Sequence, residues 1–152
     1  MNLEEYKKKR DFKKTQEPDG TFRDIKKKGL VYVIQRHDAS HLHYDLRLEE
    51  ESVLKSWAIP KDPPLKLGIK RLAVQTEDHP LGYEDFEGTI PEGEYGAGDV
   101  KIWDKGTYLP LEKNSSKRIF DIAGKKLQGK YCLIKLKSKN ADDKNWLFFK
   151  MK

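Results

Sequence analysis

The chain has 152 residues, which suits one compact domain over residues 1–152 with a hydrophobic core of its own. A single cysteine excludes an internal disulfide, and no apolar run or signal-peptide segment indicates a membrane or secreted protein. The formal net charge of +6 favours a polyanionic partner such as nucleic acid, but a solvated basic surface explains it equally well. We therefore expect a soluble, cytoplasmic protein that is a monomer.

The N-terminal segment is dominated by charged residues and turn formers. Residues 1–29 contain the basic run YKKKRDFKK and the sequence EPDG at 17–20, which is typical of a turn. We interpret this segment as a basic arm or a partly ordered extension.

Strands are predicted from residue 30 onward. The run LVYVIQ at 30–35 is rich in β-branched and aromatic side chains. The next run, HLHYDLRLE at 41–49, alternates apolar and polar residues almost strictly, as a half-buried strand does. Its apolar face would carry Leu42, Tyr44, Leu46 and Leu48. Its polar face would carry His41, His43, Asp45, Arg47 and Glu49.

The rest of the chain repeats this pattern. Further strands are predicted at 53–60, 71–78, 100–109, 129–139 and 145–152. Loops or turns are predicted at 61–70, 79–99 and 140–145, and a short helical or turn segment at 111–128. Short strands separated by turns indicate a mostly β fold. We expect a small, closed or partly open antiparallel β-barrel with a minor helix and a long Gly/Pro-rich loop.

Three of the four histidines lie between residues 37 and 43. On a strand, His43 and Asp45 would point the same way, about 6–7 Å apart. If His37 folds in from the preceding turn, these three residues could bind a divalent cation and leave positions open for water and a phosphate oxygen. Arg47, next on that face, could bind the phosphate in a bidentate manner. We expect His41 at the rim, with a role as metal ligand as the lesser alternative.

A simpler interpretation stays open for each of these residues. The polar strand face could simply face water, with a His–Asp hydrogen bond of no functional meaning. His79 could bind phosphate or donate a proton to a leaving oxygen, or it could be a loop histidine in water. The glycines of GTIPEGEYGAGDV at 88–100 indicate tight turns beside a site rather than a P-loop, because the Lys-Ser/Thr ending is missing.

Apolar strands hold the remaining distinctive residues. Cys132 lies in such a strand, so we predict a buried structural thiol. Three tryptophans on separate strands are predicted to lie in the core: Trp57, Trp103 and Trp146.

Several separated motifs resemble the phosphoesterase domain of bacterial ATP-dependent DNA ligase D, including its free-standing bacterial and archaeal form. These motifs are HDASHLHYDLRLE at 37–49, VLKSWAIPK at 53–61, KRLAV at 70–74, EDHPLGY at 77–83 and FEGTIPEGEYGAGDV at 86–100. The segments KRDF at 9–12 and TQEPDG at 15–20 resemble the opening motif of the family. The resemblance covers nearly the whole chain.

The resemblance implies a Mn²⁺-dependent 3′-end-healing enzyme on a compact β-barrel. Such enzymes remove a 3′-phosphate, and can remove a 3′-terminal ribonucleoside, to leave a 3′-hydroxyl for repair by non-homologous end joining. By similarity, His37, His43 and Asp45 match the metal ligands, a set that would also suit Zn²⁺, Co²⁺ or Fe²⁺. The other matching positions are Arg47 and His79 at the scissile phosphate, Tyr83, Lys61 and Arg71 in the active site, and Arg10, Asp11 and Glu17 in the N-terminal segment.

Two departures from the family pattern qualify this expectation. Ser40 and His41 stand where two basic residues are expected, so a contact to the substrate strand is lost or moved. The sequence also contains no ligase or polymerase module, so we expect a DNA ligase or polymerase to act in trans. The competing hypotheses are a non-catalytic module that binds strand ends and recruits such an enzyme, and a phosphomonoesterase for small esters.

Overall fold

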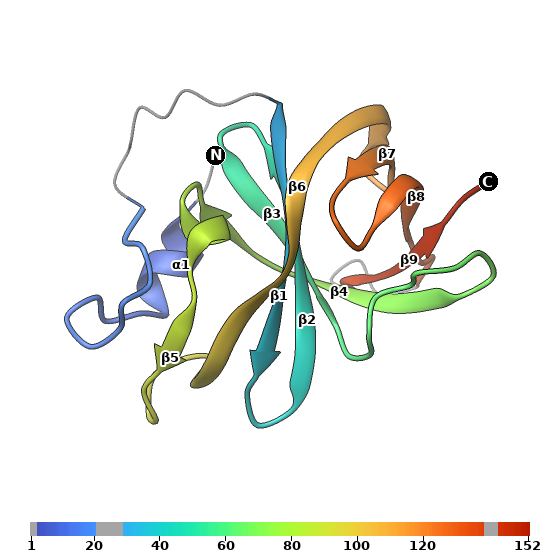
Figure 1. The fold of residues 1–152 in the computed structure, drawn as a ribbon. Helices are drawn as coiled ribbons and strands as arrows, with labels where there is room; N and C mark the ends of the chain where they lie inside the picture. Colours follow the sequence, from blue (N-terminus) through green and yellow to red (C-terminus); the bar gives the residue numbers. More distant parts are fainter. Residues whose placement is uncertain (1–2, 21–28, 139–142) are drawn as a thin grey trace.

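A computed structural model describes residues 3–20, 29–138 and 143–152. Within these ranges the chain forms two short helices and nine strands (Figure 1). The helices are the α-helix α1 (Glu4–Lys8) and the 3₁₀-helix η1 (Tyr83–Asp85). The strands are β1 (Leu30–Asp38), β2 (Leu42–Glu50), β3 (Val53–Ile59), β4 (Lys70–Pro80), β5 (Gly88–Ile90), β6 (Gly98–Asn114), β7 (Lys117–Ala123), β8 (Gln128–Lys135) and β9 (Asn145–Lys150).

Eight of these strands close into an antiparallel barrel. Hydrogen bonding follows the order β1-β2-β3-β4-β9-β8-β7-β6, and β6 pairs with β1 to complete the ring. β6 achieves this because it is 17 residues long and pairs with β1 through its first part and with β7 through its last part. β5 lies outside the ring on the edge of β6. The predicted β-barrel with a minor helix is therefore confirmed, and the barrel is closed.

The barrel interior is filled by inward-facing apolar side chains from all of its sides. On β2 these are Leu46 and Leu48, as the alternating pattern predicts, whereas Leu42 at the start of the strand is 40% exposed. Trp57 and Trp146 are buried in the interior, with ring centroids 5.6 Å apart, and Trp103 is partly buried against it. Cys132 is buried, as expected, and burial raises the pKa of its thiol.

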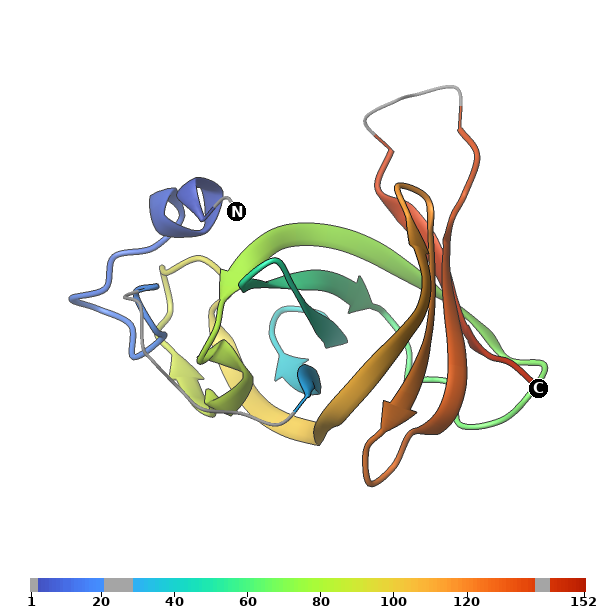
Figure 2. The same ribbon diagram turned by 90° about the horizontal axis from the view of Figure 1, so that it is seen from above.

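A second, smaller apolar cluster lies on the outer face of β1–β3. It joins Tyr6 of α1 to Leu54 of β3 and to the segment between β4 and β6, and its buried members are Tyr6, Leu54, Tyr83, Phe86, Ile90 and Val100. Figure 2 shows α1 and the residues after it outside the barrel, on the side away from β7–β9. Part of the outer barrel surface is therefore covered by a second layer.

Two expectations about individual segments need correction. The short helical or turn segment predicted at 111–128 contains turns but no helix: these residues form the end of β6, the strand β7 and the start of β8, because Phe120 and Ile122 alternate into the barrel interior. The predicted loop 79–99 begins later than expected, since β4 continues through His79 and Pro80. The predicted turn at 140–145 and the basic arm at 1–29 lie partly outside the described residues. No helix among the described residues is both long and apolar enough to cross a membrane.

Candidate active site

The register of β1 and β2 brings the predicted metal ligands together. His37 on β1 is the direct cross-strand partner of His43 on β2, and their ring centroids are 4.7 Å apart. Asp45 follows two residues after His43 on the same face. Its Oδ2 lies 3.6 Å from His37 Nδ1 and 3.3 Å from His43 Nε2. One donor atom from each of these three residues lies within 4.8 Å of the others, a spacing that suits one metal ion.

Backbone carbonyls fix the orientation of both imidazoles. His37 Nε2 lies 2.6 Å from the carbonyl oxygen of Gly96, and His43 Nδ1 lies 3.1 Å from that of His41. Each imidazole therefore has one nitrogen at a backbone carbonyl and the other at the Asp45 carboxylate, so a cation that takes the place of the proton between ring and carboxylate would meet all three groups. This donor set fits a divalent cation, because two neutral imidazoles and one carboxylate meet with their unshared electron pairs inward.

The charges around Asp45 keep it ionised. Burial alone would raise the pKa of its carboxyl, but the Arg47 guanidinium and the hydrogen bonds from His37 and His43 outweigh burial and hold that pKa well below its ordinary value. Burial lowers the pKa of His43, but the Asp45 carboxylate and the His41 carbonyl together outweigh it, so the net shift is upward. The carboxylate is therefore available as an anionic ligand at neutral pH.

Arg47 is buried and held by three polar side chains. Its Nε donates to Gln35 Oε1 at 2.7 Å and its Nη1 donates to Ser56 Oγ at 2.8 Å. Its Nη2 lies 3.4 Å from Asp45 Oδ2. The guanidinium carries five N–H donors, so these contacts leave donors for an anion in the neighbouring cavity. Gln35 in turn donates to the carbonyl oxygens of Tyr83 and Phe86, which ties the arginine to the outer layer.

His79 lies on β4 and is buried, which excludes the solvated loop position considered above. Its Nδ1 lies 3.0 Å from the carbonyl oxygen of Glu77, and its Nε2 lies 3.4 Å from Arg10 Nη2. Burial, and then the charges of Arg47 and Arg10, hold the pKa of His79 well below its ordinary value. In the free protein the ring is therefore neutral, with its Nε2 lone pair facing Arg10.

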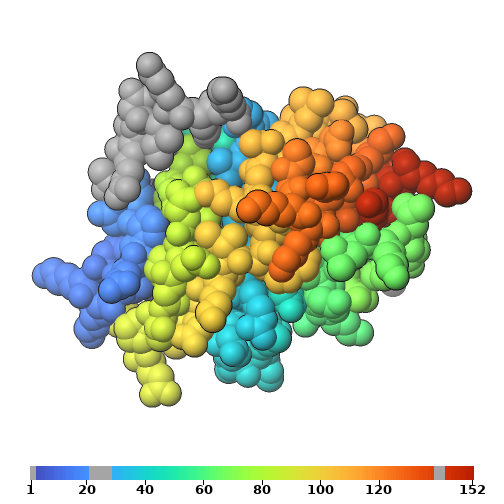
Figure 3. All heavy atoms as spheres, in the orientation of Figure 1, coloured from blue at the N-terminus to red at the C-terminus, as the bar shows by residue number. Residues whose placement is uncertain are grey.

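The N-terminal segment supplies charged groups to the same site. Arg10 Nε donates to Glu17 Oε2 at 2.9 Å, and both side chains are at least 95% buried. The hydroxyl of Tyr83 donates to the same Glu17 oxygen at 2.5 Å. In Figure 3 this N-terminal segment lies against the segment that follows β4. Arg10, Glu17, His79 and Tyr83, which are widely separated in sequence, therefore meet in one network.

These groups surround a cavity of about 210 Å³, which we call the site cavity. Its lining consists of Arg10, His37, Ala39, His43, Asp45, Arg47, Ala58, Thr76, Glu77, His79, Tyr83, Ile90, Tyr95 and Gly96. Gln35, Ser56, Glu77 and Tyr95 were missed by sequence reasoning. Gln35, Ser56 and Glu77 could have been found, because each is a polar residue at a strand position that faces away from the barrel interior.

Other predicted site residues lie away from this lining. Asp11 is exposed, and its carboxylate accepts a hydrogen bond from the backbone of Lys13. Lys61 is also exposed. The Arg71 guanidinium donates hydrogen bonds to the backbone carbonyl and to the carboxylate of Asp62. His41 is exposed next to the cavity rim, as expected, and contributes its backbone carbonyl to the site.

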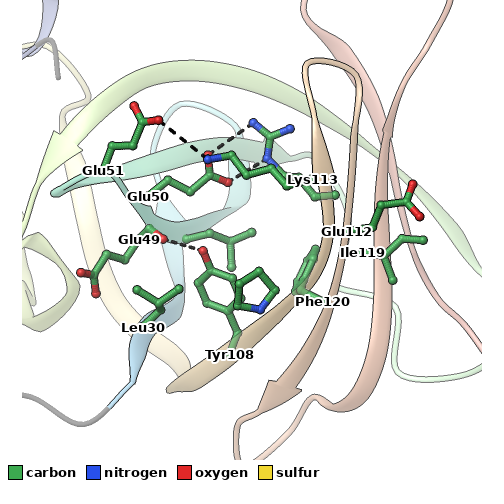
Figure 4. A pocket seen from close by; sticks show the side chains of 12 residues that line it. Leu30, Glu49, Glu50, Glu51, Tyr108, Glu112, Lys113, Ile119 and Phe120 are labelled. Carbon is green, nitrogen blue, oxygen red and sulfur yellow. Dashed lines mark hydrogen bonds and ion pairs between the residues drawn. The ribbon is translucent and has the colours of Figure 1, made fainter.

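A second cavity, of about 170 Å³, opens near the end of β2 between β6 and β7 (Figure 4). Both cations of its lining pair with Glu50, Arg118 at 2.7 Å and Lys113 at 3.4 Å. The hydroxyl of Tyr108 donates to the carbonyl oxygen of Glu49. The histidine and carboxylate cluster found among the described residues lies in the site cavity instead.

Comparison with known proteins identifies the family. The profile of the DNA ligase D 3′-phosphoesterase domain matches residues 35–135. The chain belongs to this family. It is 48% identical to the multifunctional non-homologous end joining protein LigD of Pseudomonas aeruginosa and 45% identical to that of Mycolicibacterium smegmatis, over 99% of its own length. The corresponding protein of Mycobacterium tuberculosis is 44% identical over the same share of the chain.

The chain spans only about a fifth of the length of these relatives, between 18% and 20%. The matched residues of the phosphoesterase family include the three candidate metal ligands, Arg47, His79 and Tyr83. The resemblance stated from the sequence is therefore confirmed at the level of the family. A hydrolase role at DNA ends follows from it, whereas the roles of single residues depend on the geometry above.

Proposed function

We propose that this protein is a metal-dependent 3′-phosphoesterase that removes 3′-phosphates and 3′-terminal ribonucleosides from DNA or RNA strand ends. The product would be a 3′-hydroxyl end for non-homologous end joining, sealed by a DNA ligase or extended by a polymerase acting in trans. The observation that carries the proposal is the cluster of His37, His43 and Asp45 beside the Arg47 guanidinium in one cavity.

The metal would be held by His37 Nδ1, His43 Nε2 and an Asp45 oxygen. We propose Mn²⁺, and the same ligands also suit Zn²⁺ and Co²⁺. When bound, the ion supplies Lewis-acid polarisation of a phosphoryl oxygen. The carbonyls of Gly96 and His41 keep both rings in the ligating orientation, which is the part of this chemistry that the chain itself provides.

The phosphate would lie between Arg47 and His79. The remaining N–H donors of Arg47 stabilise the negative charge that develops on the nonbridging oxygens as water attacks phosphorus. Gln35, Ser56 and Asp45 hold the guanidinium in place before substrate arrives, so little reorganisation is needed at the moment of reaction. The bond between phosphorus and the 3′-oxygen breaks, and the 3′-oxygen takes up a proton.

Because His79 is neutral in the free protein, it can donate a proton to the leaving 3′-oxygen only if the bound substrate first raises its pKa. A phosphate dianion in the site cavity adds negative charge beside the ring and opposes the downward pKa shift caused by Arg47 and Arg10. We propose that His79 contacts the scissile phosphate and, once protonated in the complex, assists the leaving 3′-oxygen. Tyr83 keeps Glu17 and the N-terminal segment close to this contact.

Residues outside the site cavity complete the proposal. Arg10 and Glu17 bring the N-terminal segment into the active site through their ion pair. Lys61, Arg71 and Asp11 would contact parts of the strand that extend beyond the site cavity. We also propose that the protein acts as a cytoplasmic monomer.

The test is an end-labelled oligonucleotide assay with strands that end in a 3′-phosphate, a 3′-ribonucleotide or, as a control, a 5′-phosphate. Each strand is incubated with Mn²⁺, Zn²⁺ or a chelator. We expect metal-dependent loss of the 3′-phosphate and no loss of the 5′-phosphate, and the ribonucleotide strand reports the second activity separately. Absence of cleavage with every metal would contradict the proposal and favour a strand-end-binding module.

His43→Ala and His41→Ala form a matched pair for the metal site. Each variant removes one imidazole, His43 on β2 or His41 just before it. Of these two residues, only His43 directs a ring nitrogen at Asp45. Because His41 contributes its backbone carbonyl, His41→Ala preserves the contact to His43 Nδ1. Activity should disappear in His43→Ala and persist in His41→Ala; equal activity of the two variants would contradict the ligand assignment.

A further inference from the structure

Tyr95 differs from the other tyrosine of the site cavity because its ring is accessible. It is 46% exposed, whereas Tyr83 is 2% exposed. The ring of Tyr83 is already in contact with that of His79, at a centroid separation of 4.6 Å, and with the Arg47 guanidinium. Tyr95 therefore offers aromatic surface that a molecule entering the site cavity can cover.

A tight turn fixes Tyr95 next to the metal ligands. The backbone N–H of Ala97 donates to the carbonyl oxygen of Glu94 at 3.1 Å, which makes Tyr95 and Gly96 the two central residues of the turn. Gly96 has a φ of 75°, a conformation that side chains other than glycine rarely adopt. The carbonyl of Gly96 is the one that accepts the hydrogen bond from His37. One turn therefore positions both a metal ligand and the exposed ring.

Cationic groups flank this ring. Lys9 Nζ lies 4.6 Å from the ring centroid and 3.4 Å from the hydroxyl oxygen, and Arg10 Cζ lies 5.4 Å from the centroid. Glu77 and Glu5 hold Lys9 in place, each at 3.1 Å. An exposed aromatic ring beside cations is the combination with which proteins bind single-stranded nucleic acid, because the ring stacks on a base while the cations attract the backbone.

We infer that Tyr95 stacks on the base of the 3′-terminal nucleotide and thereby determines specificity for strand ends over small phosphate esters. This inference rests on the proposed function and extends it to substrate recognition. The groups that surround the phosphate cannot distinguish a strand end from a simple phosphomonoester, since both present the same charged oxygens. An aromatic platform distinguishes them without sequence preference, because every base has a π-face.

The test is a double-mutant cycle between the enzyme and its substrate. Wild type and Tyr95→Ala are each assayed on one oligonucleotide 3′-phosphate with a normal terminal base and on one whose terminal nucleotide is abasic. Tyr95→Ala should lower kcat/KM roughly 5- to 100-fold on the normal strand and have little further effect on the abasic strand. Wild type should lose a similar factor when the base is removed.

Two further variants separate stacking from other roles of the ring. Tyr95→Phe removes the hydroxyl contact to Lys9 but keeps the π-face, so the coupling to the base should persist. Phe149→Ala is the matched control, since Phe149 also lies beneath a lysine, with Lys70 Nζ 5.2 Å from its ring, but is absent from the lining of the site cavity. Mn²⁺ titration of Tyr95→Ala checks that the turn still holds His37.

The outcomes are distinguishable. Equal losses by Tyr95→Ala on both strands would overturn the inference, because the ring would then act on the phosphate site rather than on the base. The same holds if Tyr95→Phe behaves like Tyr95→Ala, or if Tyr95→Ala retains full activity on the normal strand. Absence of wild-type activity on the normal strand would instead contradict the proposed function itself.

Discussion

The two faces of β2 are buried by different kinds of contact. Leu46 and Leu48 face the barrel interior and are surrounded by apolar side chains. Asp45 and Arg47 face the outer layer and are also buried, at 6% and 3% exposure, but they contact charged and polar groups. The interior is stabilised by apolar burial, which tolerates many arrangements of similar volume. The polar side chains of the outer face instead need hydrogen-bond and ion-pair partners at specific positions. Substitutions there are therefore expected to affect activity more than stability.

The largest expected effect is that of Asp45→Asn. The substitution keeps the shape of the side chain but removes the only anionic group of the metal ligand set, so activity should fall by about 1000-fold or more. Metal affinity measured by titration should fall in parallel. Asp38→Asn is the control, because Asp38 is exposed at the end of β1; comparable losses in both variants would argue against a metal-binding role for Asp45.

The corresponding change in the barrel interior is Leu46→Ala. It removes a fully buried side chain and should lower the free energy of unfolding by about 2–5 kcal/mol. At a temperature where the variant is folded, its specific activity should stay close to that of wild type. Denaturant titration measures the first quantity, with Leu109→Ala, at a site that is 61% exposed, as the control. A selective loss of activity without destabilisation would contradict the contrast between the two faces.

Arg47→Lys tests whether the geometry of the outer face matters beyond its charge. Lysine keeps the positive charge but cannot contact Gln35, Ser56 and Asp45 at once, so activity should fall by about 100-fold. Arg118→Lys is the matched control, since Arg118 is also paired with a buried carboxylate but at the second cavity. That variant should lose some stability and keep its activity; an active Arg47→Lys would show that charge alone is sufficient.

The smallest expected effect concerns the pH dependence of stability at His79. Its pKa is lower in the folded protein than the ordinary value of about 6.5. Below pH 6.5 the unfolded chain therefore takes up a proton that the folded protein does not, and stability is lost as the pH falls towards the folded pKa. His79→Asn should flatten this loss in denaturant titrations between pH 7.5 and 5, relative to His41→Asn. An unchanged slope would mean that His79 is accessible to protons in the folded state.

Much of this molecule follows from local sequence pattern. Alternation in residues 41–49 places Leu46 and Leu48 inside and His43, Asp45 and Arg47 outside, because successive side chains of a strand point to opposite faces. The same alternation placed the candidate metal ligands His43 and Asp45 on one face, whereas His37, expected in a turn, lies on β1 and reaches them through the pairing of β1 with β2. The alternation of apolar and polar residues did not reveal the strands within 111–128, because many charged residues on the exposed face of β6 and β7 obscured the apolar residues directed inward.

Only the tertiary structure decided that the polar face of β2 is buried. Alternation cannot distinguish a polar face in water from one covered by another layer, since both have period two. Here α1, the residues after it and the segment between β4 and β6 cover that face, and they bring Arg10, Glu17 and Tyr83 to His79. These contacts join residues up to 69 positions apart, as between Arg10 and His79, and local periodicity holds no information at that range. The sequence by itself determined most of the strands and the residue types of the candidate metal site, whereas the covering layer determined the burial of these residues, their charges and the shape of the site cavity.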